Sequence, residues 1–268
     1  MARVRIANGL MLDYLECGDR QGAAILFVHG YLDSWRVWES SLPFLPHNHR
    51  LVFVTQRGFG DSDKPEQGYR QIDFVEDIKA FMDAVQLDHA VIVGHSMGGL
   101  IAHYLALLYP ERVDGLILVA TSASASELVE DWSIGDHDVM SLTDPIDPDF
   151  VRQAQSEDVR APVPTHRLEG QIFEAMKVPA RVWGQSMQGM FDEDHRDRLG
   201  DINVPVQILY PELDMYFTRD QQDELLALLP NASLKVYPGA GHGLQWEFPE
   251  EFGADVSAFA NDLARRIA

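Results

Sequence analysis

Short apolar runs alternate with amphipathic stretches along the first half of the chain. The strand-like runs occupy residues 4–6, 10–16, 24–28, 50–55, 89–93 and 113–120. Apolar positions at helical spacing cover residues 35–45, 72–85 and 97–109. Because strands that alternate with helices usually form a mostly parallel sheet covered on both faces, this pattern predicts an α/β fold. The first two strands flank Asn8-Gly9, a hairpin-turn dipeptide, and are expected to pair directly.

The pattern changes after residue 121. Strand-like runs become rare, and Asp, Pro and Gly separate helical stretches at residues 149–156, 166–176 and 179–191. The β/α alternation returns at residues 204–210, 219–229, 233–236 and 249–265. We therefore predict one α/β core, residues 1–121 and 202–268, interrupted by a helical cap, residues 122–201, that lies over the site. The alternative is a helical excursion that takes no part in the site.

Composition narrows the classes of function. The chain has 268 residues and a formal net charge of −21, which suits one large domain and opposes binding to nucleic acid or anionic lipid. We expect a small-molecule substrate instead. The single cysteine, Cys17, cannot form an internal disulfide and is expected to be structural. Residues 1–15 lack a signal-peptide pattern and no run could span a bilayer, so we predict a cytoplasmic protein. The sequence leaves the oligomeric state open.

A G-x-S-x-G motif, Gly94-His95-Ser96-Met97-Gly98, stands between a predicted strand and a predicted helix. In this context the serine lies on a tight, strained turn above the carboxyl ends of the strands. Glycines two residues away on either side leave room for strand and helix to approach closely. We predict that Ser96 is a nucleophile. A serine hydroxyl reacts weakly without a base, so a histidine and an orienting acid are expected elsewhere in the chain.

The base is predicted to be His242. It lies in the glycine-rich loop Pro238-Gly239-Ala240-Gly241-His242-Gly243, directly after the last predicted strand. A loop of this kind can direct one ring nitrogen toward the serine and the other toward an acid. The bland alternative is a turn histidine that happens to lie among glycines.

The acid is predicted to be Asp214. The chain order Ser…Asp/Glu…His requires a carboxylate between Ser96 and His242. Asp214 follows the predicted strand at residues 204–210, on a loop beyond the strand's carboxyl end, where catalytic loops converge. Glu212 in the same loop is the second candidate.

Ester hydrolysis builds negative charge on the carbonyl oxygen, which two backbone N–H groups must stabilise. One is predicted to belong to Met97, the residue after the nucleophile. The other is predicted to belong to Tyr31, which follows Gly30 after the strand at residues 24–28.

With these motifs in order, the chain resembles the α/β-hydrolase superfamily over essentially its full length. The segments that carry the resemblance are His29-Gly30-Tyr31, Arg57-Gly58-Phe59-Gly60-Asp61-Ser62, the Ser96 motif, Pro211-Glu212-Leu213-Asp214 and Gly239-Ala240-Gly241-His242. The resemblance implies an eight-stranded, mostly parallel sheet. Related epoxide hydrolases and haloalkane dehalogenases have Asp where this chain has Ser96, which argues against those chemistries.

Two positions depart from the pattern of these relatives. Gln56 replaces the aspartate that usually precedes the Arg-Gly-x-Gly segment, and is expected to change a structural hydrogen bond. Tyr210-Pro211 stands where a glycine is common, and is expected to reshape the loop that carries Asp214.

Large apolar side chains of the predicted cap are candidates for the pocket. They are Trp132, Phe150, Phe173, Trp183, Met187, Met190 and Phe191. Packing between cap helices explains most of them, and we select Trp183 and Met187, with Trp246 after the His242 loop, as pocket residues. His47-Asn48-His49 and Asp136-His137-Asp138 lack the framework of a metal site, so we predict no metal and no cofactor.

The leading hypothesis is hydrolysis of a carboxylic ester or lactone through an acyl-enzyme on Ser96. The same triad could instead hydrolyse a C–C bond of a dienoic diketone, or carry out cofactor-free perhydrolysis. A ligand receptor that retains the triad with little turnover is a third hypothesis. The sequence does not identify the acyl chain, the alcohol or the stereochemical preference.

Overall fold

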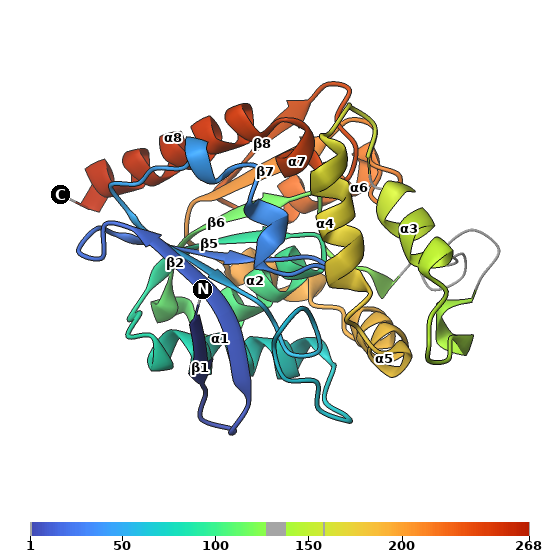
Figure 1. Cartoon of the computed structure of the whole chain (residues 1–268). Helices are drawn as coiled ribbons and strands as arrows, with labels where there is room; N and C mark the ends of the chain where they lie inside the picture. Colours follow the sequence, from blue (N-terminus) through green and yellow to red (C-terminus); the bar gives the residue numbers. More distant parts are fainter. Residues whose placement is uncertain (1, 127–137, 158, 268) are drawn as a thin grey trace.

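A computed structural model describes residues 2–126, 138–157 and 159–267 (Figure 1). Its centre is one eight-stranded sheet with the strand order β1-β2-β4-β3-β5-β6-β7-β8. Only β2 runs antiparallel to its neighbours, β1 and β4, and all the other neighbouring strands are parallel. The predicted α/β fold with a mostly parallel sheet is confirmed.

The sheet opens with the predicted hairpin. The strands β1 (Ala2–Arg5) and β2 (Met11–Gly18) pair in register from Ala2↔Tyr14 to Arg5↔Met11. Gly9 takes the turn at φ 93°, a conformation that L side chains rarely adopt. The six other strands are β3 (Ala24–Val28), β4 (Arg50–Val54), β5 (Ala90–His95), β6 (Val113–Val119), β7 (Val206–Pro211) and β8 (Ala232–Tyr237).

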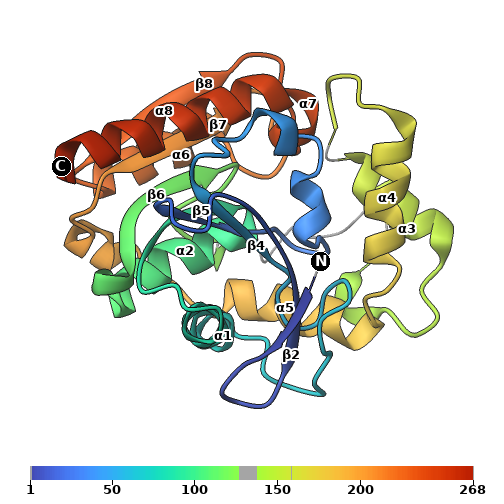
Figure 2. The ribbon, with the colours of Figure 1, turned by 60° about the vertical axis from the view of Figure 1, so that its left-hand side comes forward.

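Helices cover both faces of the sheet. Figure 2 shows α8 (Pro249–Ile267) along one side and α1 (Gln71–Ala84) with α2 (Met97–Leu108) on the other. The helix α6 (Arg219–Leu228) contributes Leu225 to the same apolar cluster as α1 and α2. Within residues 2–126, 138–157 and 159–267, none of the helices combines the length and the apolar character needed to cross a membrane.

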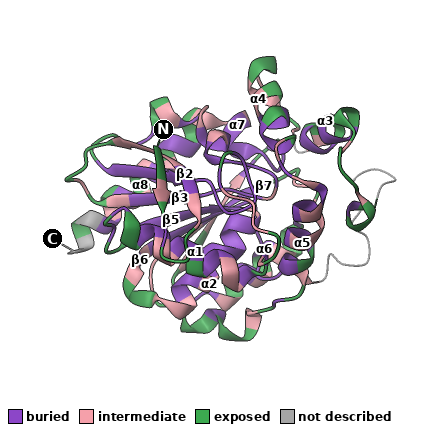
Figure 3. Cartoon of the chain, turned by 60° about the horizontal axis from the view of Figure 1, so that its bottom comes forward, coloured by how far each residue is buried: buried purple, intermediate pink, exposed green. Residues whose placement is uncertain are grey.

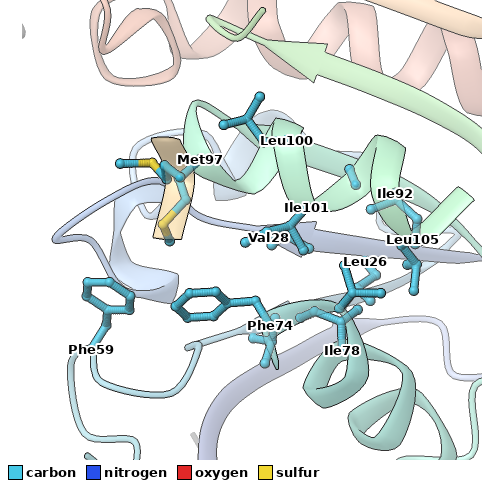
Figure 4. Close-up of a cluster of buried hydrophobic side chains, with 14 of the residues drawn as sticks. Leu26, Val28, Phe59, Phe74, Ile78, Ile92, Met97, Leu100, Ile101 and Leu105 are labelled. Atoms are coloured by element: carbon cyan, nitrogen blue, oxygen red, sulfur yellow. The ribbon is translucent and has the colours of Figure 1, made fainter. Parts of the chain in front are cut away.

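The strands are buried on both faces because their alternate side chains enter two separate apolar clusters. In β3, Leu26 and Val28 belong to the cluster under α1 and α2, whereas Ile25 and Phe27 belong to the cluster under α8. Figure 4 shows Leu26 and Val28 between side chains of α1 and α2, and Figure 3 shows the buried interior running through the sheet. Two-sided burial explains why these strands appear as continuous apolar runs in the sequence.

Among the described residues between β6 and β7, where the sequence predicts a cap, the structure forms three α-helices. They are α3 (Pro148–Glu157), α4 (Thr165–Ala175) and α5 (Ala180–Phe191). Both views place them together at the end of the molecule away from the C-terminus (Figures 1 and 2). The short 3-10 helices η5 (Val139–Ser141) and η6 (Arg196–Asp201) flank this group. Residues 127–137 of the predicted cap, including Trp132 and Asp136-His137, lie outside the described residues.

The predicted helix at residues 35–45 is wrong. The structure forms two 3-10 helices there, η1 (Trp35–Trp38) and η2 (Leu42–Phe44). Pro43 explains the break, because proline has no backbone N–H and disfavours helical geometry in the residue before it. Further short elements escaped sequence analysis: the 3-10 helices η3 (Pro110–Arg112), η5 and η6, and the short helix α7 (Leu244–Glu247) after the His242 loop.

Candidate active site

Ser96 stands at the sharp turn between β5 and α2. Its backbone has φ 52° and ψ −120°, a strained conformation for a residue with a side chain. The carbonyl of Val119 in the neighbouring strand accepts a hydrogen bond from the Ser96 N–H, which anchors the turn to the sheet. The turn therefore lifts the side chain of Ser96 above the carboxyl end of β5, as the motif predicts.

The glycines around Ser96 are required by packing. A Cβ atom added at Gly98 would lie 2.2 Å from the carbonyl oxygen of Val28 in β3. A Cβ atom added at Gly94 would lie 2.3 Å from the carbonyl oxygen of Gly98. Both contacts involve backbone atoms that cannot rotate away, so only glycine allows β3, β5 and α2 to approach this closely.

Asp214 and His242 form a hydrogen-bonded pair. The Nδ1 atom of His242 lies 3.0 Å from Oδ2 and 3.1 Å from Oδ1 of Asp214. The side chain of Asp214 is fully buried and that of His242 is 6% exposed. Because a carboxylate only accepts hydrogen bonds, this contact places a proton on Nδ1. In the neutral imidazole, Nε2 is then the acceptor nitrogen.

The two candidate acids in the loop after β7, Asp214 and Glu212, have different hydrogen-bond partners. Oδ1 of Asp214 accepts hydrogen bonds from the backbone N–H groups of Tyr216 and Phe217, at 2.9 and 3.3 Å, which fixes the carboxylate beneath His242. Glu212 instead accepts a hydrogen bond from the Gly239 N–H at 3.0 Å. The structure thus brings Asp214 to His242 and gives Glu212 to the backbone of the neighbouring loop.

The loop that carries His242 is held at two further points. The Nε2 atom of buried His95 donates to the carbonyl oxygen of His242 at 3.0 Å. Glu247 in α7 accepts hydrogen bonds from the N–H of Gly241 at 3.1 Å and from that of Ala161 at 2.7 Å. Glu247 therefore ties the His242 loop to the chain between α3 and α4.

The two predicted oxyanion donors lie on the turns that flank Ser96. Met97 is the first residue of α2, where a backbone N–H has no partner within the helix. Tyr31 precedes Leu32, which has φ 65°. Within the described part of the chain, neither of these N–H groups donates a hydrogen bond. The Tyr31 hydroxyl donates to the Trp183 carbonyl at 2.9 Å, which links this turn to α5.

The turn that carries Tyr31 is braced by His29 and Gln56. The N–H of Gln56 donates to Nε2 of His29 at 3.0 Å, and the Gln56 amide donates to the His29 carbonyl at 2.8 Å. Burial lowers the pKa of His29 to about 4, so its ring is neutral near neutral pH. Gln56 thus holds His29 through both its backbone and its side chain, and the expected change relative to an aspartate at this position stays a prediction.

Ser96 and His242 line the same cavity. Its wall also includes Tyr31, Asp33 and His95 from the core, and Gln155, Met190 and Phe191 from α3 and α5. The cavity therefore lies between the sheet and the helices that separate β6 from β7. Asp214 lies behind His242, out of the lining.

The three selected pocket residues are not part of this lining, which corrects the prediction. Trp183 is fully buried, and its indole N–H donates to the Val178 carbonyl at 3.1 Å. Met187 is 1% exposed within the core cluster. Trp246 belongs to the cluster under α8. All three pack behind the wall because α5 and α7 turn these side chains toward the interior, an orientation that helical spacing alone does not fix.

Two polar lining residues, Asp33 and Gln155, were missed by sequence analysis. Asp33 follows the predicted oxyanion residue Tyr31 by two positions, and this closeness was the available signal. Gln155 lies in α3, far from every motif, and no local pattern marks it. Met190 and Phe191 were among the cap side chains considered, and both do line the cavity.

Comparison with known proteins identifies the family. A family model described as "alpha/beta hydrolase fold" matches residues 23–176, which is more than half of the chain. The chain belongs to the α/β-hydrolase family. This α/β-hydrolase is 30% identical to a protein named "Non-heme chloroperoxidase" from Streptomyces lividans, over 97% of this chain and 99% of the relative.

Other relatives of this α/β-hydrolase are named for different activities. It is 27% identical to the "2-hydroxy-6-oxo-6-phenylhexa-2,4-dienoate hydrolase" of Burkholderia cepacia, over 87% of this chain and 85% of that one. A solved structure titled "Est816 as an N-Acyl homoserine lactone degrading enzyme" superimposes with a TM-score of 0.81 at 26% identity. That match covers 96% of this chain and 100% of the other. The similar proteins thus include one named for lactone degradation and one named as a dienoate hydrolase.

Proposed function

We propose that this α/β-hydrolase cleaves carboxylic esters or lactones through an acyl-enzyme formed on Ser96. The observation that carries the proposal is the buried Asp214–His242 pair, whose imidazole lines the same cavity as the strained Ser96 turn. The similarity to a structure described as a lactone-degrading enzyme supports the same class of substrate.

In the proposed reaction, Oγ of Ser96 attacks the carbonyl carbon while Nε2 of His242 takes up the hydroxyl proton. The N–H groups of Met97 and Tyr31 stabilise the negative charge on the former carbonyl oxygen. The C–O bond then breaks, and His242 returns the proton to the leaving alcohol. His242 next deprotonates a water molecule that attacks the acyl-enzyme, which releases the acid and restores Ser96. Throughout, Asp214 holds the imidazole in one tautomer.

Two other reactions would use the same residues. The relative named as a dienoate hydrolase supports C–C bond hydrolysis as a second candidate. Perhydrolysis, in which hydrogen peroxide replaces water at the acyl-enzyme, is the third candidate and leaves the acylation step unchanged. A substrate panel that contains esters, lactones, a dienoate and peroxide separates the three.

The test is hydrolysis of short-chain p-nitrophenyl esters by wild type, Ser96→Ala and a control, Ser257→Ala. Ser257 lies in α8, where its hydroxyl donates to the Gly253 carbonyl away from the cavity. We expect Ser96→Ala to lower kcat by at least about 10³-fold and Ser257→Ala to match wild type. Equal rates in wild type and Ser96→Ala would overturn the proposal.

A further inference from the structure

A buried carboxylate lies in the cavity wall beside the Ser96 turn. The side chain of Asp33 is 4% exposed and lines the cavity. A Cβ atom added at Gly30 would lie 3.1 Å from Oδ2 of Asp33 and 3.2 Å from Cβ of Ser96. The carboxylate and the predicted nucleophile therefore both lie in contact distance of one position, that of a Cβ atom at Gly30 on the turn that carries Tyr31.

Asp33 makes no hydrogen bond to another described residue. Its titratable neighbours include His29 and His95, and the Nδ1 atom of His95 lies 3.7 Å from Oδ2, beyond hydrogen-bond distance. The Nε2 atom of His95 is already committed to the His242 carbonyl. A buried carboxylate without a donor is costly, so a donor supplied by a bound molecule would be favoured at this position.

A second polar side chain enters the same cavity from the other side. Gln155 in α3 is 3% exposed and lines the cavity, and its Oε1 atom is buried without a hydrogen-bond partner among the described residues. Its amide can both donate and accept, whereas the Asp33 carboxylate only accepts. The neighbouring lining residues Met190, Phe191 and Phe217 are apolar. Nδ1 of His95 is a further buried atom of the described wall without a hydrogen-bond partner, and it lies on the Asp33 side, 3.7 Å from Oδ2.

We propose that Asp33 and Gln155 form a subsite for a hydrogen-bond donor, a hydroxyl or an amide N–H, that the substrate carries close to its scissile carbonyl. This inference rests on the proposed function of Ser96. Asp33 accepts a charge-assisted hydrogen bond from this donor. The Gln155 amide N–H donates a hydrogen bond to the hydroxyl oxygen or the carbonyl oxygen of the same group. Asp33 also repels an anionic substituent at this position, which disfavours carboxylate-bearing substrates such as dienoates.

The test compares kcat/KM within matched substrate pairs that differ only in the donor. The pairs are ethyl lactate and its methyl ether, hydroxyethyl and methoxyethyl acetate, and N-acetylglycine and N-acetylsarcosine ethyl esters. We expect wild type to prefer the donor in at least one pair by about ten- to hundredfold, mainly through KM. Asp33→Asn and Gln155→Leu should reduce that ratio, whereas Asp220→Asn, on the exposed start of α6, should preserve it.

Comparing an anionic with a neutral ester distinguishes substrate recognition by Asp33 from a purely structural role. Asp33→Asn should raise the rate on monoethyl succinate relative to ethyl butyrate, because the variant no longer repels the substrate's carboxylate. A variant that is merely destabilised loses activity on both esters alike. Unchanged ratios in Asp33→Asn, or no donor preference in wild type, would overturn the proposal.

A binding experiment keeps this inference distinct from the proposed function. Calorimetry with N-ethyl lactamide and N-ethyl propionamide measures donor recognition without turnover. We expect wild type to bind the lactamide more tightly and Asp33→Asn to bind the two alike. Equal affinity in wild type, including no detectable binding of either amide, overturns the subsite. Donor-selective binding without ester hydrolysis would support the subsite while the proposed function fails.

Discussion

The Nδ1 atom of His242 lies 3.0 Å from Oδ2 of Asp214, and the carboxylate is fully buried. The contact fixes the tautomer that the proposed catalysis by Ser96 requires. We expect Asp214→Asn to lower kcat by about 10⁴-fold with little change in KM, because an amide permits the wrong tautomer. Glu212→Gln is the matched control, since Glu212 bonds the Gly239 backbone, and it should retain most of the activity. Steady-state kinetics on a p-nitrophenyl ester measure both, and the reverse ranking would assign the acid to Glu212.

Glu247 is expected to act by positioning His242. It bonds the N–H groups of Gly241 and Ala161, and so holds the His242 loop without touching the cavity. Glu247→Ala should lower kcat about tenfold or more by misplacing the imidazole, while Glu247→Gln, which keeps an acceptor oxygen, recovers part of the loss. Kinetics of the two variants beside wild type test this. Equal activity in Ala and Gln variants would contradict a positioning role.

The close approach at Gly98 predicts a sharp contrast between two glycine substitutions. Gly98→Ala places Cβ against the Val28 carbonyl and should lower the free energy of unfolding by about 1–3 kcal/mol. Gly170→Ala, inside α4 with nothing within 4 Å of the added Cβ, should raise it by about 0.5–1 kcal/mol. Urea titrations of both variants give the comparison. A stabilising Gly98→Ala would mean that the elbow packs more loosely than the structure shows.

The ion pair between Arg57 and Asp77 is expected to be structural. Its atoms lie 2.5 and 2.6 Å apart, and the two side chains are 9% and 2% exposed. Asp77→Ala leaves a buried guanidinium unpaired, which should cost about 3–5 kcal/mol of unfolding free energy. Removing Glu169 from its exposed pair with Arg152 should change stability little. Thermal unfolding of Asp77→Ala and Glu169→Ala distinguishes the two, and similar Tm values would refute the argument.

Two buried histidines predict a loss of stability in acid. Burial lowers the pKa of His29 to about 4 and that of His103 to about 3, from an ordinary value of 6.5. Below pH 6.5 these two histidines are protonated in the unfolded chain, whereas burial keeps them neutral in the folded chain. The contribution of the two neutral histidines to the free energy of unfolding is therefore fully present above pH 6.5. It should fall as the pH drops from 6.5 toward about 4 for His29 and toward about 3 for His103.

His103→Met tests the contribution of one of these groups. His103 lies inside α2, away from the residues that line the cavity, so its replacement leaves the predicted site intact. We expect the variant's unfolding free energy, measured by urea at several pH values, to depend less on pH than that of wild type. Parallel curves for the two proteins would show that His103 does not contribute.

Much of the fold was predictable because the strands are short, apolar and regularly separated by helices. Residues 24–28 were placed without error as β3, since both faces of that strand are buried and neither end is ambiguous. The prediction of one helix at residues 35–45 was wrong because it rested on the spacing of apolar residues and ignored Pro43. Apolar spacing reports which side is buried, whereas the type of helix depends on backbone hydrogen bonds that one proline removes.

Part of the candidate site was also predictable from sequence, and part was not. Ser96 and His242 each lie among glycines, and Asp214 follows a strand-like run, and a single sequence displays both patterns. The pocket has no such local pattern, because its wall is assembled from the turn after β3, the loop after β7, α3 and α5. Trp183 was selected for its size, yet it packs behind Tyr31, while Asp33 and Gln155 were passed over. Which side of a helix faces a cavity depends on how that helix docks, and the sequence does not state it.

The central claim is that Ser96 becomes covalently modified during turnover. Treatment of wild type with a fluorophosphonate, followed by intact-mass and peptide mass spectrometry, tests it most directly. We predict one adduct per chain, on the peptide that contains Ser96, with loss of ester hydrolysis in proportion to labelling. Ser96→Ala should remain unlabelled. An adduct on another residue, or full ester hydrolysis by protein labelled at Ser96, would contradict the account.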